Sequence, residues 1–159
     1  MEQKDKIQAK GHVNLKVFRS GKLIEERDAH NTIQTTGGIE NLAKYLTAEY
    51  TGSINWMGIG LNTGGKGDDA SLTALNSEVG EDGVASTTHH ILSSRSMTGS
   101  GVDTFVCTFT MTGSALVKEV GLFDASADGN MFARQQFNVL SLVATDTLQI
   151  TWTVTITDT

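Results

Sequence analysis

The sequence lacks proline altogether and contains a single cysteine. Roughly 5% proline is usual in proteins, so its absence means that the turns depend on Gly, Asn, Asp and Ser. The lone Cys107 excludes an internal disulfide and a cysteine-based zinc cluster. Because Cys107 alternates with Phe105, Phe109 and Met111, we expect its thiol to be buried in a strand.

Long apolar runs are also missing. No stretch approaches the roughly 18 apolar residues that span a bilayer, and the charged opening of residues 1–6 lacks the apolar segment of a signal peptide. We therefore expect a protein that is made in the cytoplasm and has no membrane partner. Its 159 residues are enough for one domain with a sizeable core and too few for two comfortable ones.

Positive charge is scarce. The formal net charge is −6, and only 19% of the residues are charged, against roughly 25% on average. Residues 1–30 hold seven Lys/Arg against five Asp/Glu, and the remainder holds five against thirteen. This acidic body offers no basic groove, so nucleic acid is not an expected partner, although a charged arm could meet an acidic neighbour.

What the sequence has in abundance is strict alternation, above all between Asp146 and Thr159. Apolar residues alternate there with threonine and glutamine, at Leu148, Ile150, Trp152, Val154 and Ile156. This period of two predicts a strand that covers a core with one face and shows hydroxyl groups to water with the other. Because the apolar row includes a tryptophan, we expect this strand to be central in a sandwich.

Other segments complete a mainly β prediction. Residues 13–17 and 22–25 flank Ser20-Gly21 and predict an N-terminal hairpin, and turn signals recur about every ten residues in the second half of the chain. Further strands are expected at residues 54–60, 84–97, 105–111, 116–123 and 131–137. The fold class is therefore an antiparallel β-sandwich of a jelly-roll-like kind, with an immunoglobulin-like arrangement left open.

One or two short helices and a flexible arm complete the expected organisation. Apolar spacing at residues 39–46 predicts a helix with Thr36 as its N-cap, and Leu72, Leu75 and Val79 suggest a second, shorter one. Residues 1–10 are polar and unpatterned, so we expect a flexible N-terminal arm, followed by a single sandwich domain at residues 11–159.

The sequence contains one near match to a nucleotide-binding motif. The stretch from Gly60 to Lys66 follows the Gly-x-x-x-x-Gly-Lys pattern of a phosphate-binding loop, but Gly67 stands where a Ser or Thr must bind magnesium. Asp68 and Asp69 then follow and would repel a phosphate. A mobile Gly-rich surface loop is the better interpretation.

Other reactive residues also lack a chemical pattern. His89 and His90 adjoin on an expected strand, so their side chains point to opposite faces and cannot easily share a metal; we expect them to be exposed or half-buried. The carboxylates at residues 68, 69, 78, 81 and 82 miss the spacing of a calcium loop and suggest a solvated acidic edge. No serine lies in a nucleophile motif. We therefore expect no catalytic residue, cofactor or metal, and no enzyme.

Three residues remain as candidates for an interaction. Trp56 precedes the Gly-rich loop and could stack on a ligand, whereas Trp152 is assigned to the core. Asn62 and Lys66 are the polar side chains that the loop could present. A carbohydrate is the ligand class that these side chains would suit.

Several stretches together resemble small virion structural proteins of tailed bacteriophages. The resemblance covers about residues 28–157 and rests on a strand that ends in Glu-Val-Gly-Leu-Phe, then Met-Phe-Ala-Arg with a following Phe, and a closing Asp-Thr-Leu-Gln-Ile-Thr-Trp-Thr-Val-Thr strand, at residues 119–123, 131–137 and 146–155. Asn31-Thr32-Ile33 and the run from Met57 to Gly64 fit the same pattern.

The resemblance implies a non-enzymatic structural protein located in the virion. The short chain has no coiled-coil heptads and no fibrous repeat, which favours a capsid decoration (cement) protein that binds and stabilises the assembled head. The expected partners are the major capsid protein and further copies of the same chain. The alternative is a tail-fibre or baseplate module that binds a host-surface glycan or another tail protein.

Overall fold

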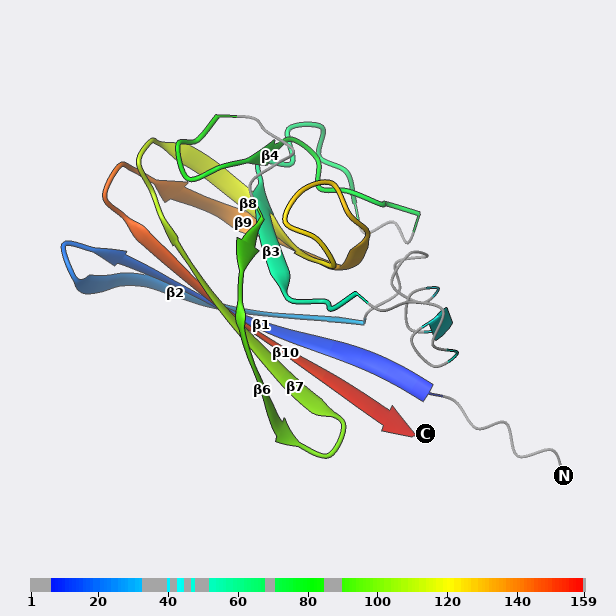
Figure 1. Cartoon of the computed structure of the whole chain (residues 1–159). Helices are drawn as coiled ribbons and strands as arrows, with labels where there is room; N and C mark the ends of the chain where they lie inside the picture. The colour runs from blue at the N-terminus through cyan, green and yellow to red at the C-terminus, as the bar shows by residue number, and fades with distance from the viewer. Residues whose placement is uncertain are drawn as a thin grey trace, which may run out of the picture.

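Two antiparallel sheets packed as a sandwich contain most of the residues that the computed structural model describes, which are 7–32, 40, 43–44, 47, 52–67, 71–84 and 90–158 (Figure 1). The strands are β1 (Ile7–Arg19), β2 (Lys22–Thr32), β3 (Trp56–Gly60), β4 (Glu78–Val79), β5 (Ile91–Leu92), β6 (Ser94–Gly99), β7 (Val102–Thr110), β8 (Ala115–Phe123), β9 (Met131–Leu142) and β10 (Thr147–Asp158). Sheet A has the order β2-β1-β10-β7-β6, and sheet B has the order β4-β3-β8-β9, with β5 also paired to β3. The predicted mainly β sandwich is confirmed.

The alternating strand β10 lies in the middle of sheet A, between β1 and β7. Leu148, Ile150 and Trp152 are fully buried and Val154 is 4% exposed, whereas Ile156 is 39% exposed. The central position and the buried Trp152 are therefore confirmed. The apolar row covers the core along most of the strand and reaches solvent only at its far end.

The predicted N-terminal hairpin is formed by β1 and β2. Its two turn residues, Ser20 and Gly21, have φ angles of 50° and 74°, as a type I′ turn requires. β1 begins at Ile7, which pairs with Asp158 of β10. This corrects the predicted boundary at residue 11, because the last four residues of the expected arm belong to the sheet; residues 1–6 lie outside the described part of the chain.

An ion pair attaches the hairpin to the turn before β10. Both Nε and one terminal nitrogen of Arg19 donate to the Asp146 carboxylate at 2.8 Å, and the amide of Val143 donates to the same group at 3.0 Å. Asp146 is fully buried. The hydrogen bonds from Arg19 outweigh the effect of burial and hold the pKa of Asp146 below its usual 3.8.

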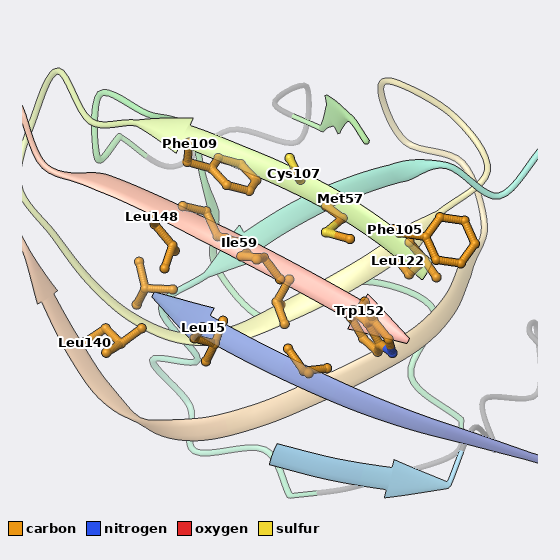
Figure 2. Close-up of a cluster of buried hydrophobic side chains, with 14 of the residues drawn as sticks. Leu15, Met57, Ile59, Phe105, Cys107, Phe109, Leu122, Leu140, Leu148 and Trp152 are labelled. Atoms are coloured by element: carbon orange, nitrogen blue, oxygen red, sulfur yellow. The ribbon is translucent and has the colours of Figure 1, made fainter. Parts of the chain in front are cut away.

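The core lies between the two sheets (Figure 2). Met57, Ile59 and Leu122 of sheet B are fully buried and belong to the same cluster as Leu15 and Trp152 of sheet A. Cys107 is buried in this cluster, as predicted, and burial raises the pKa of its thiol to about 12. A buried thiol with a raised pKa stays protonated near neutral pH and is a poor nucleophile.

The two expected helices have different outcomes. The first, at residues 39–46, lies mostly outside the described residues; residues 40, 43 and 44 of it are described and are helical. The second is wrong, because residues 72–77 form turns and irregular chain, and Val79 belongs to strand β4. No helix in the described part of the chain is long and apolar enough to cross a membrane.

Candidate functional site

The structure brings together two of the three residues that the sequence proposed for an interaction. Asn62 and Lys66 lie in the loop that follows β3, whereas Trp56 lies at the other end of that strand, about 13 Å away at 3.3 Å per residue. Trp56 is half-buried and packs against a small apolar cluster of Leu75, Phe123 and Met131. It therefore does not form one binding surface with the loop.

Asn62 holds the Gly-rich loop from inside. It is only 6% exposed and has a positive φ of 46°. Its side chain accepts a hydrogen bond from the Lys66 amide at 3.0 Å and donates to the Lys66 carbonyl at 3.2 Å. It also contacts Asn76 at 3.2 Å and Gln136 at 3.1 Å. The loop that the sequence suggested would be mobile is thus anchored by side-chain hydrogen bonds.

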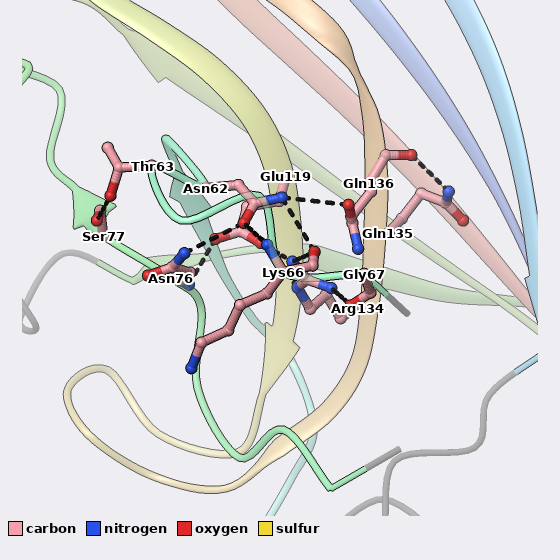
Figure 3. A network of polar contacts seen from close by, with 10 residues as sticks. All are labelled: Asn62, Thr63, Lys66, Gly67, Asn76, Ser77, Glu119, Arg134, Gln135 and Gln136. Atoms are coloured by element: carbon pink, nitrogen blue, oxygen red, sulfur yellow. Dashed lines mark hydrogen bonds and ion pairs between the residues drawn. The ribbon is translucent and has the colours of Figure 1, made fainter. Parts of the chain in front are cut away.

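A buried ion pair supports the loop from sheet B (Figure 3). Nε of Arg134 donates to Glu119 at 2.7 Å, and its terminal nitrogens donate to the carbonyls of Gly67 at 3.0 Å and Lys66 at 3.2 Å. Glu119 is fully buried and also accepts the Asn76 amide at 2.5 Å. Burial raises the pKa of Glu119, and the Arg134 charge offsets only part of this rise.

Glycines on the outer face of sheet B make room for these charges. A Cβ on Gly60 would lie 2.6 Å from the Glu119 carboxylate, and one on Gly58 would lie 2.8 Å from the His90 ring. Gly121 lies under the Phe123 ring in the same way, at 2.6 Å. Polar side chains can therefore lie flat across this face instead of pointing away from it.

A second buried pair, His90 with Glu78, lies on the same face. His90 Nε2 is 3.0 Å from Glu78 Oε1, although neither atom has a well-aligned hydrogen bond, and Nδ1 lies 2.7 Å from the Ala125 carbonyl. The His90 ring also stacks on Phe123 with centroids 3.8 Å apart. Burial acts to lower the pKa of His90, but Glu78 and the Ala125 carbonyl outweigh it, so the pKa is raised above 6.5.

This pair corrects two expectations. His90 is 6% exposed and Glu78 is 8% exposed, so neither belongs to a solvated surface as the sequence suggested. His89 lies outside the described residues. Sequence reasoning also missed Glu119 and Arg134; the available signal was the alternation of Gly58 and Gly60, which leaves one face of a strand without side chains.

The surface above this network is polar and open. Lys66 is exposed, and Figure 3 shows its side chain directed away from the network. An open cavity of about 590 Å³ lies between Lys66-Gly67 and residues 71–76. No group of three or more His, Cys, Asp or Glu among the described residues could hold a metal. The site is therefore suited to binding a polar partner through Lys66 and the loop.

No family model, curated protein or solved structure matches the chain. A β-sandwich hosts many unrelated functions, so the fold does not assign one.

Proposed function

We propose that this chain is a non-enzymatic structural protein of a tailed-bacteriophage virion and decorates the assembled capsid. The motifs at residues 119–123, 131–137 and 146–155 support the assignment to a virion. The observation that carries the decoration role is the outer face of sheet A, a wide surface rich in hydroxyl groups and partly or fully exposed.

Cross-strand pairing extends this face over all five strands of sheet A. One row runs through Ser96, Thr104, Thr153, His12 and His30. The hydroxyl oxygens of Thr104 and Thr153 lie 3.4 Å apart. Parallel rows add further hydroxyl groups at Ser94, Thr98, Thr108, Thr110, Thr147, Thr151 and Thr155.

Several charges on this face are paired within the chain. His12 lies 2.8 Å from Asp28, and Lys16 lies 3.5 Å from Glu26. Hydrogen bonds from Asn14 and then His12 lower the pKa of Asp28. Such a face forms hydrogen bonds with a complementary surface but adheres poorly to unrelated proteins, because it presents neither a large apolar patch nor a strong field.

A capsid would bind many copies of this protein, each through the outer face of sheet A. Each copy would bridge neighbouring subunits of the major capsid protein, and the buried area would exist only in the assembled shell. Binding to the assembled state alone stabilises that state by mass action, and many weak contacts act together on one shell.

The location test is immunogold labelling of intact virus particles with an antibody against this chain, viewed by negative-stain microscopy. We expect gold over the heads. Gold confined to tails would overturn the decoration role, and no gold on any particle would overturn the virion assignment. Heads stripped of the protein should also lose resistance to heat, whereas unchanged heads would contradict a stabilising role.

A matched pair of variants tests the proposed face. Thr153→Glu puts a charge at the centre of sheet A, and we expect it to abolish binding to stripped heads. Thr73→Glu makes the same change at an exposed position in the loop over sheet B and should leave binding intact. Equal binding by the two variants would exclude this face of sheet A as the capsid contact.

The alternative is a tail-fibre or baseplate module, which the cavity beside Lys66 favours. In that role the loop would bind a host-surface glycan or another tail protein. We would then expect Lys66→Ala to weaken glycan binding, and Trp56→Ala to act only through stability, because Trp56 packs in an apolar cluster. A glycan array without hits would count against glycan recognition.

A further inference from the structure

The exposed edges of the two sheets differ in how they are protected. An edge strand presents unpaired backbone groups, and proteins block such edges with charges, bulges, short strands or covering groups. In sheet A the edge strands are β2 and β6, and in sheet B they are β9 on one side and the short β4 and β5 on the other. Every one of these edges carries such a device except β6, in the stretch Ser94–Met97 where it pairs regularly with β7.

The protected edges use all four of these devices. β2 carries Glu25, Glu26 and Arg27, and a bulge interrupts its pairing with β1. Arg27 also reaches the β9 edge, where it donates to the carbonyls of Asn138 and, at 3.1 Å, Val139. β4 and β5 are two residues long, which is too short to form an extended pairing surface.

β6 has none of these devices along its regular part, and its pairing with β7 becomes irregular only after Met97. It spans Ser94–Gly99, every residue in it is exposed, and no described strand pairs with its free edge. Its one charged side chain, Arg95, is held by Asp103 of the neighbouring strand β7 and lies over the Phe105 ring at 5.9 Å. β6 therefore carries a single charged side chain, whereas β2 carries three in a row at residues 25–27.

β6 also carries the most exposed large apolar side chain of the described residues. Met97 is 72% exposed and borders an apolar cavity of about 350 Å³. Phe105, Phe132, Val154 and Ile156 line the same cavity. A partner strand at this edge would remove apolar surface from water in addition to forming backbone hydrogen bonds.

We propose that β6 pairs antiparallel with β6 of a second copy of this chain, around a two-fold axis at Ser96, so that two sheets A form one continuous sheet. The residue pattern of the strand is self-complementary in this register. Ser96 faces Ser96 of the second copy, and Ser94 faces Thr98, which continues the hydroxyl rows of the outer face.

The inner face is equally compatible with this register. Arg95 lies opposite Met97 of the second copy, so the aliphatic stem of the arginine covers the exposed methionine. A register centred on Arg95 is disfavoured, because it would place two like charges directly opposite each other. The register centred on Ser96 avoids this repulsion, and the pairing closes as a two-fold dimer.

The test measures the mass of the full chain by sedimentation equilibrium. A pairing through one strand edge falls in the size class of weak interfaces. The protein concentration should therefore be varied up to about 1 mM, the weak limit of specific association. We expect a reversible change from the 17.0 kDa chain to twice that mass. A monomer over the whole range would overturn the proposal.

Opposite charges at the two-fold axis give a sharper result. Ser96→Lys and Ser96→Glu each place like charges face to face and should be monomeric at concentrations where the unchanged chain is dimeric. An equal mixture of the two variants should regain the doubled mass, because the introduced ammonium group of one copy then faces the introduced carboxylate of the other. Ser126→Lys, a lysine substitution at an exposed loop position, should dimerise normally.

A dimer that persists in both Ser96 variants would overturn the proposal, because it would use another surface. Circular dichroism checks that each variant is folded. Hydrogen exchange on the unchanged chain gives an independent readout, since amide protection at residues 94–99 should rise with concentration if β6 pairs. The dimer does not depend on the capsid role, and gold labelling absent from heads would leave this result unaffected.

Discussion

The two sheets of this protein use their outer faces in opposite ways. Sheet A keeps one face in the core and the other in contact with solvent, as the alternating burial of β10 demonstrates. Sheet B is buried on both faces along β3 and the adjoining parts of β8 and β9, where Leu72 and Leu75 pack over its outer side against Trp56, Phe123 and Met131. A regular pattern of residues therefore describes sheet A, whereas sheet B depends on particular contacts.

The difference extends to how charge is used. On sheet A the His12–Asp28 and Lys16–Glu26 pairs are partly exposed and screened by solvent, and the buried carboxylate of Asp146 is paired at a turn with the partly exposed Arg19. On sheet B, Glu119 and Arg134 form a pair without solvent, and removing one partner would leave the other charge uncompensated. Stability should therefore be much more sensitive to substitutions on the outer face of sheet B.

The largest effect is expected for Arg134→Met. The buried Glu119 would lose its counter-charge, and Lys66 and Gly67 would lose their donor, so the free energy of unfolding should fall by about 3–5 kcal/mol. Urea denaturation measures the loss. Lys16→Met breaks the exposed pair with Glu26 on sheet A and should cost at most about 1 kcal/mol. Similar losses in both variants would remove the distinction between the sheets.

A smaller loss is expected for Gly121→Ala. The new Cβ would meet the Phe123 ring at 2.6 Å and Leu75 at 3.1 Å, and Phe123 is held by its stack on His90. We expect a loss of about 1–3 kcal/mol in the free energy of unfolding. Gly67→Ala is the matched control, because a Cβ there has no neighbour within 4 Å. An unaffected Gly121→Ala protein would mean that Phe123 moves freely.

The two sheets should also differ in how their contribution to stability depends on pH. Because the pKa of His90 is raised above 6.5, its stabilisation is complete below pH 6.5 and is lost as the pH rises through the folded pKa. The lowered pKa of Asp146, beside sheet A, has the opposite sign: its stabilisation is present above pH 3.8 and is lost on acidification through the folded pKa.

Substitutions at two histidines test the direction in which stability changes with pH. Urea midpoints measured between about pH 6 and pH 8 should fall for the unchanged chain and vary much less for His90→Gln. His12→Gln, on the open face of sheet A, should retain the slope of the unchanged chain. A slope that follows His12 instead of His90 would contradict the assignment of this dependence to sheet B.

The smallest effect is expected for Thr153→Val on sheet A. The side chain is partly exposed, and its contact with the Thr104 hydroxyl is long at 3.4 Å. The free energy of unfolding should change by less than about 0.5 kcal/mol, measured by urea denaturation. A larger change would indicate that the outer face of sheet A is covered in solution.

Sequence reasoning predicted sheet A better than sheet B for a physical reason. Alternation reports which side of a strand is apolar, and this located the core residues of β10 and the buried Cys107. It cannot report that a loop will cover the other side, so the buried Glu119, Arg134 and His90 were missed. Strand order was also inaccessible, because β1 and β10 pair across nearly the whole described chain and local alternation does not report which distant strands become neighbours.

The candidate site was predicted in part. Asn62 and Lys66 do lie together, but Asn62 serves mainly to hold the loop, which composition alone could not indicate. The helix expected at residues 72–79 failed because its apolar residues face different layers. Leu72 and Leu75 cover sheet B, whereas Val79 lies in the main core, and Ser77 between them has a positive φ of 59°.

The central position of β10 has a consequence for the order of folding. The β1–β2 hairpin is local and can form in about 1–10 μs, but β1 acquires its second neighbour only when β10 arrives from the opposite end of the described chain. Until then Val13, Leu15 and Val17 form an apolar row without the strand that flanks it. Such non-local pairing is slow, on the order of milliseconds to seconds, so the newly made hairpin passes through a period in which it is prone to aggregate.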